Sequence, residues 1–187
     1  VNSGSDCGWL DKVMFSTAPV PTPTPTPTPA PSPSPSNLGD AVDNTALTWS
    51  TGGSSSWFAQ GVTYYYGGDA AQSGAIANNQ DSWIQTSLTG PGTLQYSWKV
   101  SSETNYDWLE VYLDGVRQTR ISGNVDWQQM SVSIPSGTHT VKWRYTKDYS
   151  VNSGSDCGWL DKVMFSTATA PPSRQHRDAD QRQRMVP

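Results

Sequence analysis

Residues 37–168 contain many short segments in which apolar and polar side chains alternate, and no long segment with the period of a helix. The apolar faces of the clearest segments carry three sets of residues: Leu94, Tyr96, Trp98 and Val100; Leu109, Val111 and Leu113; and His139, Val141, Trp143 and Tyr145. A period of two is typical of a half-buried β-strand. Because polar side chains fill the opposite faces, the pattern predicts antiparallel strands.

Turn signals lie between these segments. They are TGPGT at 89–93, Asp114-Gly115, and PSG at 135–137. Glycine, proline and aspartate in such short runs favour reversal of the chain. Several strands at spacings of about 8–12 residues favour a sandwich over a barrel or a propeller. The sequence therefore predicts an all-β fold, a two-sheet antiparallel β-sandwich.

Four longer loops are expected at one end of this sandwich. If each turn reverses the chain, the strands at 94–100, 107–113, 116–121, 127–134, 138–146 and 159–166 alternate in direction. The loops that then share one end are 77–81, 101–106, 122–126 and 147–158. They carry Asp81, Glu103, Asp107, Asp126, Asp148 and Asp156, together with Tyr106, Trp127 and Tyr149. Function usually lies on the loop-bearing end of such a scaffold.

A duplication sets the domain organisation. Residues 1–18, VNSGSDCGWLDKVMFSTA, recur letter for letter as residues 151–168, which indicates a tandem array of units of about 150 residues. We interpret residues 1–18 as the C-terminal strand of a preceding repeat and residues 37–168 as the β-sandwich module. Residues 19–36 form a Pro/Thr/Ser linker, an N-terminal spacer of polyproline II type, and residues 169–187 are expected to be a disordered tail.

Composition and charge exclude some classes of binding partner. No run approaches the roughly 20 apolar residues that a membrane-spanning helix needs, so no membrane partner is expected. The formal net charge is −4 and no basic stripe is visible, which argues against nucleic acid. Nine Trp and eight Tyr, many of them beside polar residues, favour a β-rich protein that binds ligands on its surface.

The final strands resemble a known group of modules. IPSGTHTVKWRY at 134–145, followed by GWLDKVMF at 158–165, resembles the last strands of bacterial extracellular jelly-roll modules. Galactose-binding-like carbohydrate-binding modules and MAM-like adhesin repeats share this shape. SSETNYDWLEVYLDG at 101–115 is similar to the corresponding segment of tandem extracellular modules of environmental bacteria. The resemblance covers about residues 45–166 and implies a jelly-roll β-sandwich that is secreted or displayed at the cell surface.

Calcium is the cofactor that the acidic loops predict. Ca²⁺ takes six to eight oxygen ligands, which flexible loops rich in Asp, Asn and Ser supply. The expected ligands are Glu103, Asp107, Asp148 and Asp156. The resemblance implies a further structural calcium ligand in the last strand, Asp161. The alternative is that these are ordinary turn residues whose side chains bond the local backbone.

Carbohydrate is the partner that the aromatic residues predict. Sugar-binding modules pack aromatic faces against sugar rings, with amides and carboxylates nearby to bond the hydroxyls. The expected ligand-binding residues are Tyr106, Trp108, Glu110, Tyr112, Trp127 and Tyr149, with Tyr64, Tyr65 and Tyr66 as further candidates. Trp83, Trp98 and Trp143 are expected in the core instead. For the ligand-binding set, the alternative is that the side chains cover a sheet or a loop.

The sequence gives little support for catalysis: a carboxylate pair such as Asp107 and Glu110 could serve a glycosidase, but nothing in the sequence shows that the two converge. His139 alternates in phase with Val141 and Trp143, and no nucleophile-elbow, zinc-protease or phosphate-loop motif is present. Each unit has one cysteine, because Cys7 and Cys157 are copies of one position. We expect Cys157 to be buried, and the alternative is a disulfide between units.

We therefore predict a non-catalytic carbohydrate-binding module of a secreted or surface multi-modular bacterial protein. The alternative is a structural stalk or adhesin repeat without its own sugar site. Because residues 5–15 match the last strand of the module, strand exchange between chains through this segment is a further expectation.

Overall fold

The computed structural model describes residues 37–168. The predicted strand of a preceding repeat at 1–18, including the exchange segment 5–15, the linker at 19–36 and the tail at 169–187 lie outside the described residues. Among residues 37–168, no helix has both the length and the apolar character needed to cross a membrane.

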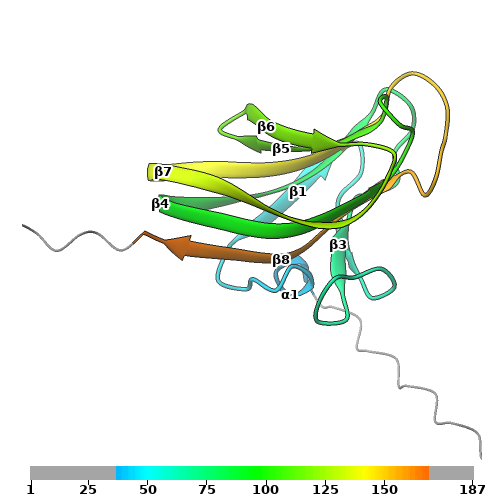
Figure 1. Cartoon of the computed structure of the whole chain (residues 1–187). Coiled ribbons are helices and arrows are strands. Elements are labelled where there is room, and N and C mark those ends of the chain that lie inside the picture. The colour runs from blue at the N-terminus through cyan, green and yellow to red at the C-terminus, as the bar shows by residue number, and fades with distance from the viewer. Residues whose placement is uncertain (1–36, 169–187) are drawn as a thin grey trace, which may run out of the picture. The chain divides into compact units, whose positions relative to one another are not determined.

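The described chain forms one short helix and eight strands (Figure 1). In chain order the elements are α1 (Leu38–Ala41), β1 (Trp49–Gly53), β2 (Phe58–Gln60), β3 (Ala70–Gln72), β4 (Asp81–Ser101), β5 (Trp108–Leu113), β6 (Val116–Ile121), β7 (Asn124–Thr146) and β8 (Cys157–Thr167). All pairings between strands are antiparallel, as predicted.

The long strands β4 and β7 pair along their whole length and fold over together. Tyr96 of β4 is paired with Met130 of β7, yet its ring lies 5.3 Å from the ring of Trp143, also on β7. Thirteen residues of straight strand would hold Met130 and Trp143 about 40 Å apart. The pair of strands must therefore double back, and it does so where Gly90 is paired with Gly137.

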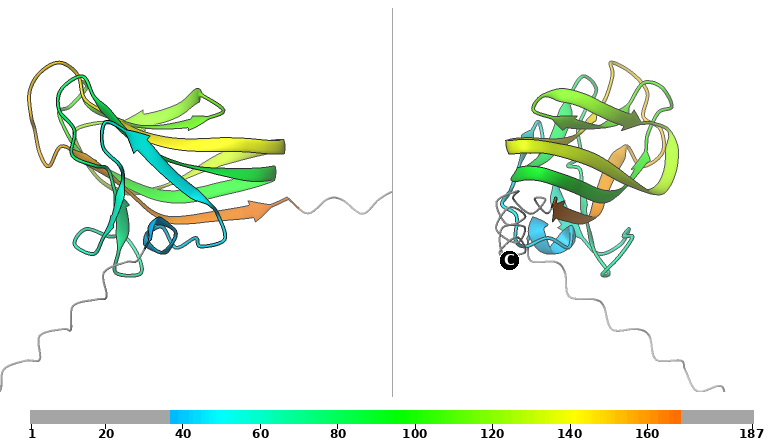
Figure 2. Two further views of the ribbon diagram at one scale, coloured as in Figure 1. Left: turned by 180° about the vertical axis from the view of Figure 1, so that it is seen from behind. Right: turned by 60° about the vertical axis from the view of Figure 1, so that its left-hand side comes forward.

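The fold-over divides one hydrogen-bonded sheet into two packed layers (Figures 1 and 2). The first layer consists of β2, β3, β8, residues 92–101 of β4 and residues 124–134 of β7. The second layer consists of β1, residues 81–90 of β4, residues 137–146 of β7, β5 and β6. The predicted antiparallel β-sandwich is thus confirmed.

Two of the three predicted turns are corners within strands. The segments 89–93 and 135–137 do reverse the chain, but the ladder continues through them with one register shift, between Gly90 and Gly92. A Cβ at Gly90 would collide with the carbonyl oxygen of Pro135, so only glycine permits the close approach of the two backbones. Asp114-Gly115 is the hairpin turn between β5 and β6, with φ values of 50° and 79°.

Aromatic side chains fill the space between the layers. Trp98 and Trp143 are fully buried, and Tyr96 contacts both rings edge-on, at 5.5 and 5.3 Å between centroids. The predicted apolar faces of 94–100, 107–113 and 138–146 supply most of this core, with Leu113 only partly buried and His139 at its margin. Edge-on contacts between aromatic rings add to the stabilisation that burial provides.

The last strand, β8, lies inside the first layer between β3 and β4. Cys157, at its start, is 5% exposed, and burial raises the pKa of its thiol to about 12. The prediction of a buried cysteine is confirmed. A second copy of the strand can enter this position only if β8 leaves both neighbours, so exchange through residues 5–15 stays a prediction.

Truncation of Trp143 tests whether the two layers pack through this residue. Trp143→Ala should lower the free energy of unfolding by about 3–5 kcal/mol, because it leaves a cavity against Tyr96 and Trp49. Urea unfolding followed by tryptophan fluorescence and circular dichroism measures the loss. Trp127→Ala, on the outer surface of the first layer, is the control. Equal losses in both variants would contradict the packing described.

Candidate functional site

The four predicted loops meet at one end of the sandwich. Asn78 donates to the backbone oxygen of Tyr149 at 3.1 Å, the backbone of Asn105 donates to the Ser122 hydroxyl at 2.9 Å, and the backbone of Ser155 donates to the Ser101 hydroxyl at 2.9 Å. These bonds join loops that are up to 71 residues apart in the chain. The structure therefore gathers the loops as the alternation of strand directions predicts.

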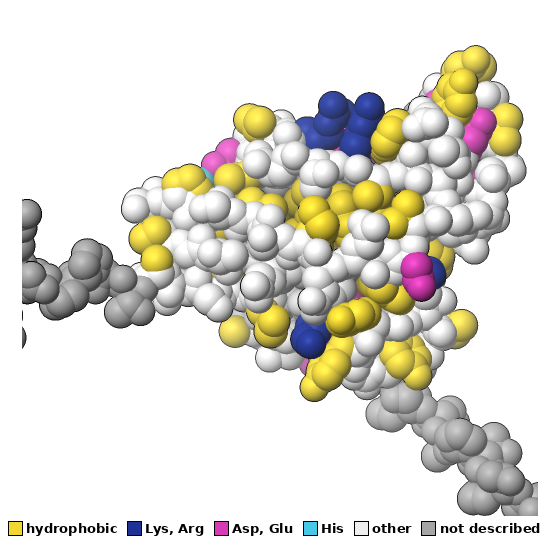
Figure 3. Space-filling model, in the orientation of Figure 1, with side chains coloured by type: hydrophobic (Ala, Val, Ile, Leu, Met, Phe, Trp, Pro, Cys, Tyr) yellow, Lys and Arg dark blue, Asp and Glu magenta, His cyan; other side chains and the backbone are white. Residues whose placement is uncertain are grey.

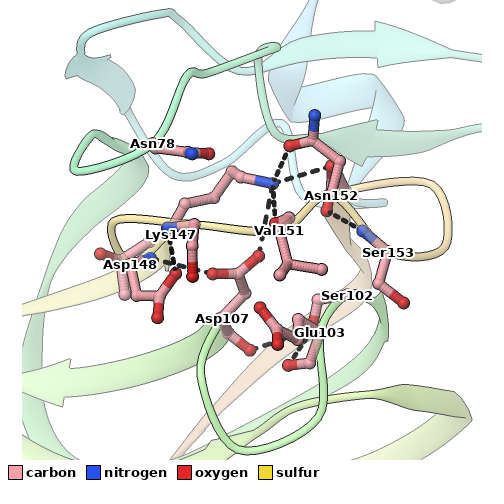
Figure 4. A network of polar contacts seen from close by, with 12 residues as sticks. Asn78, Ser102, Glu103, Asp107, Lys147, Asp148, Val151, Asn152 and Ser153 are labelled. Atoms are coloured by element: carbon pink, nitrogen blue, oxygen red, sulfur yellow. Dashed lines mark hydrogen bonds and ion pairs between the residues drawn. The ribbon is translucent and has the colours of Figure 1, made fainter.

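A buried lysine lies at the centre of this end (Figure 4). The Lys147 side chain is 0% exposed, and its ammonium is 2.7 Å from the Asp156 carboxylate and 3.3 Å from that of Asp107. It also donates to the side-chain oxygen of Asn152 at 2.9 Å. Asp107 is 0% exposed as well. A buried charge is costly without a counter-ion, so Lys147 and Asp107 must stay together. Because they belong to different loops, their pairing holds the loops at 101–107 and 147–156 together.

Three acidic groups converge beside this lysine. Ligand atoms of Glu103, Asp107 and Asp148 all lie within 4.8 Å of one another. The Oε2 of Glu103 is buried and accepts no hydrogen bond, whereas the Oδ2 of Asp107 is the oxygen that faces the Lys147 ammonium at 3.3 Å. Desolvation, with the nearby charges of Asp148 and Asp107, raises the pKa of Glu103. These three carboxylates and that of Asp156 lie near a single ammonium, that of Lys147, so the arrangement is short of positive charge and the Oε2 of Glu103 is without a partner.

Asp161, the fifth predicted metal ligand, lies far from this end, in the middle of β8. It is 0% exposed, and its Oδ2 accepts the backbone N–H groups of Tyr65 and Tyr66 at 2.7 and 3.0 Å. Its Oδ1 is buried without a hydrogen bond. Burial, together with the carboxylate of Asp43, raises the pKa of Asp161 to about 7, although the two backbone donors act in the opposite direction.

The six predicted ligand-binding residues occupy three separate places. Tyr106 and Tyr149 are 56% and 75% exposed on the loops. Trp127 lies on the outer surface of the first layer, where its ring is 5.9 Å from that of Tyr65. Trp108, Glu110 and Tyr112 lie on the outer surface of the second layer, since Leu109 and Val111 between them face the core. The structure therefore does not bring the six residues together in one site.

The outer surface of the second layer has a depression of about 450 Å³. It is lined by Asp81, Trp83, Gln85, Tyr112, Asp114, Gly115, Thr140, Lys142 and Arg144. Trp83 and Tyr112 provide two aromatic side chains, and the other residues provide amide, hydroxyl, carboxylate and cationic groups. Residues of β4, β7 and the β5–β6 hairpin form this depression, so it rests on the rigid sheet.

Trp83 corrects the sequence prediction, which placed it in the core. In β4 the buried side chains before the corner are Ser82, Ile84, Thr86 and Leu88, so Trp83 faces outward. Its indole lies over Gly52 of the neighbouring strand β1, where a Cβ would collide with the ring. The ammonium of Lys142 lies 4.7 Å from the indole centre. The phase of Ile84 and Leu88 is the sequence signal that identifies Trp83 as an outward residue.

Glu110 is held beneath the polar groups of this surface. Its carboxylate is 3% exposed and accepts the Tyr112 hydroxyl at 2.6 Å. Arg117 and Arg144 each donate to it at 3.0 Å. Since the carboxylate is enclosed by these three groups, Glu110 positions Tyr112 and the two guanidinium groups and does not itself face a ligand.

The chain resembles known proteins in its fold. No family model and no curated protein sequence matches the chain. The solved structures similar to it are mainly carbohydrate-binding modules and adhesin domains. The secreted serine protease VesC from Vibrio cholerae has a TM-score of 0.50 and 16% identity, over 62% of this chain and 25% of VesC.

Two further examples show the range of these structures. The K2 adhesin domain of Lys-gingipain, from Porphyromonas gingivalis, has a TM-score of 0.49 and 18% identity, over 64% of this chain and 90% of that domain. The family 11 carbohydrate-binding module from Clostridium thermocellum has a TM-score of 0.41 and 10% identity, over 66% of this chain and 91% of that module. The chain spans only about a quarter of VesC. At such identities the likeness extends to the fold alone.

Removal of the buried ammonium tests the network at the loop end. Lys147→Met should lower the free energy of unfolding by about 3–5 kcal/mol, because Asp107 is then a buried charge without a counter-ion. The control is Lys99→Met, which removes an ion pair of the same length, 2.7 Å, but with Asp126 84% exposed. This control should lose far less, since water screens the pair. Urea unfolding measures both, and similar losses would contradict the role of Lys147.

Proposed function

We propose that residues 37–168 form a non-catalytic carbohydrate-binding module whose ligand lies in the depression on the outer surface of the second layer. The observation that supports this most directly is the depression of about 450 Å³ with two aromatic side chains among convergent polar groups. Aromatic faces pack against the apolar hydrogens of sugar rings, and surrounding polar groups bond the hydroxyls. The proposed site is therefore Trp83 and Tyr112 with Gln85, Asp81 and Arg144.

Neighbouring groups hold the two aromatic side chains of the proposed site in place before a ligand binds. The indole of Trp83 lies against the backbone at Gly52, and the hydroxyl of Tyr112 is bonded to buried Glu110. A ring that is already fixed loses little conformational entropy when a ligand packs on it. Of the predicted ligand-binding residues, Tyr112 is retained at this site and Glu110 is assigned to its support. Trp108 is the next residue along the same surface.

The setting we propose for the module is a secreted or surface-displayed protein built from tandem repeats.

Tyr106 and Tyr149 are exposed at the loop end and are not needed by the proposed site. The alternative, a structural stalk or adhesin repeat without a sugar site, predicts that the depression binds no polysaccharide.

Calcium is the ion that we propose for the module. The buried oxygens without hydrogen bonds at Glu103 and Asp161, and the four carboxylates that face the single ammonium of Lys147, are the observations that support a cation. At the loop end, Glu103, Asp107 and Asp148 would hold the ion, while Asp156 is neutralised by Lys147. In the first layer, Asp161 with Asp43 would hold one. The ion would supply positive charge that fixes the loops, and it would take no part in a reaction.

Removal of Trp83 tests the proposed binding site. Trp83→Ala should weaken binding to the recognised polysaccharide about tenfold or more, since it removes the larger aromatic surface. Gly52→Ala should weaken binding with Trp83 still present, because the added Cβ displaces the indole. Affinity electrophoresis against plant, algal and bacterial polysaccharides, followed by calorimetry, measures the effect.

The control for this experiment is Trp127→Ala, which truncates a tryptophan on the opposite layer and should leave the affinity unchanged. If the unaltered protein binds no polysaccharide in the panel, the structural alternative is supported instead. If Trp127→Ala abolishes binding and Trp83→Ala does not, the site lies on the first layer.

Calcium binding is tested by thermal unfolding. Excess Ca²⁺ should raise the melting temperature by several degrees relative to EGTA, because an ion that binds only the folded state stabilises it. The double variant Glu103→Gln/Asp148→Asn should remove the part of the rise in melting temperature that is due to an ion at the loop end. Asp161→Asn should remove the part that is due to an ion in the first layer. Identical melting temperatures in Ca²⁺ and EGTA would contradict the proposal.

A further inference from the structure

The outer surface of the second layer is basic on a chain that is acidic as a whole. The net charge of the chain is −4, and residues 37–168 contain seven lysines and arginines. Four of the seven lie on this one surface: Arg117, Arg120, Lys142 and Arg144. In the space-filling view, lysine and arginine side chains gather at the upper edge of the molecule, beside the β5–β6 hairpin of this layer (Figures 1 and 3).

The acidic groups of the surface neutralise only part of this charge. Glu110 is one buried carboxylate that faces two guanidinium groups, those of Arg117 and Arg144. Asp81 is 3.9 Å from Arg144 and is the only other acid paired with these four cations within the described residues. Asp114 is bonded to His139 and to the backbone of Thr140 instead.

Two cations on this surface lie against aromatic rings and have no carboxylate partner among the described residues. The guanidinium of Arg120 is 3.6 Å from the centre of the Trp108 ring, and the ammonium of Lys142 is 4.7 Å from that of Trp83. Lys142 lines the depression itself. An ammonium on a flexible stem can turn from an aromatic face to an anion beside it, and that ion pair is stronger than the contact with the ring.

We infer that the ligand of this depression is an acidic polysaccharide, one that carries carboxylate or sulfate groups, and that Lys142 binds the anionic group beside the sugar ring packed on Trp83. The inference rests on the proposed function and goes beyond it, because it names the class of glycan. A neutral polysaccharide leaves the surplus positive charge of this surface without a partner. An acidic polysaccharide forms ion pairs with these cations while its sugar rings pack on the aromatic side chains.

The test compares pairs of polysaccharides that differ only in charge. Polygalacturonate is compared with its methyl ester, and a sulfated galactan with the same polymer after desulfation, by calorimetry at low and at raised salt. We expect binding to at least one charged polymer, with the uncharged member of that pair bound about tenfold more weakly or worse. Raised salt should weaken the charged complex, since salt screens exposed ion pairs. The pair that shows the difference identifies carboxylate or sulfate.

Lys142→Gln is the variant that tests the named residue. It should reduce affinity for the charged polymer about tenfold and leave affinity for the uncharged one unchanged. Lys162→Gln is a matched control on the first layer, because its ammonium also lies 4.7 Å from an aromatic ring, that of Tyr66. This control should bind as the unaltered protein does, and thermal unfolding verifies that both variants fold.

The possible failures are distinguishable. Equal binding of charged and uncharged polymers, lost in Trp83→Ala but not in Lys142→Gln, would overturn the inference and leave the proposed function in place. Equal loss in Lys142→Gln and Lys162→Gln, or full competition by duplex DNA, would show unspecific attraction of polyanions and overturn the inference. Absence of binding to every polymer would overturn both the inference and the proposed function.

Discussion

The joint fold-over of β4 and β7 is the constraint on which the rest of the structure depends. These two strands are hydrogen-bonded along their whole length, and their shared corner at Gly90 and Gly137 brings one half of the pair over the other. Tyr96 and Trp98 from one half then contact Trp143 from the other and exclude water between the layers. The same corner leaves the opposite ends of both strands together, which is where the long loops start and end.

Two buried charged groups then fix the parts of the molecule that face solvent. At the loop end, Lys147 is ion-paired with both Asp107 and Asp156 and so holds two loops together. On the second layer, Glu110 holds Tyr112, Arg117 and Arg144. In both places a charge that is costly to bury is kept because its partners satisfy it, and the partners are positioned as a result. The first arrangement holds the loops on which we propose a cation site, and the second holds the side chains of the surface that we propose for a ligand.

The distribution of charge separates the two regions chemically. Acidic groups gather on the loops, whereas four of the seven described lysines and arginines lie on the outer surface of the second layer. The charge of the surface that we propose for binding opposes that of the whole chain, so this surface attracts an anionic ligand locally, over distances comparable with the screening length. The aromatic rings at that surface add packing contacts that simple ionic attraction lacks.

The sequence by itself determined the class of fold and the inward faces of the strands. Leu94, Tyr96 and Trp98, and likewise Val141, Trp143 and Tyr145, are in the core where alternation places them, because the direction of a side chain along a strand is a local property. The meeting of the four long loops at one end was predicted by assuming that each turn reverses the direction of the chain. Trp83 also obeys the alternation, since Ile84 is buried beside it, although its apolar character suggested the core.

Tertiary structure alone decided which outward-facing residues share a surface. Trp108 and Tyr112 lie on the second layer and Trp127 on the first, because the corners in β4 and β7 assign each half-strand to a layer. Arg117, Arg120, Lys142 and Arg144 are separated along the chain, and antiparallel register places them side by side. Register depends on hydrogen bonds between distant segments, so neither composition nor local periodicity can reveal a basic surface on an acidic chain.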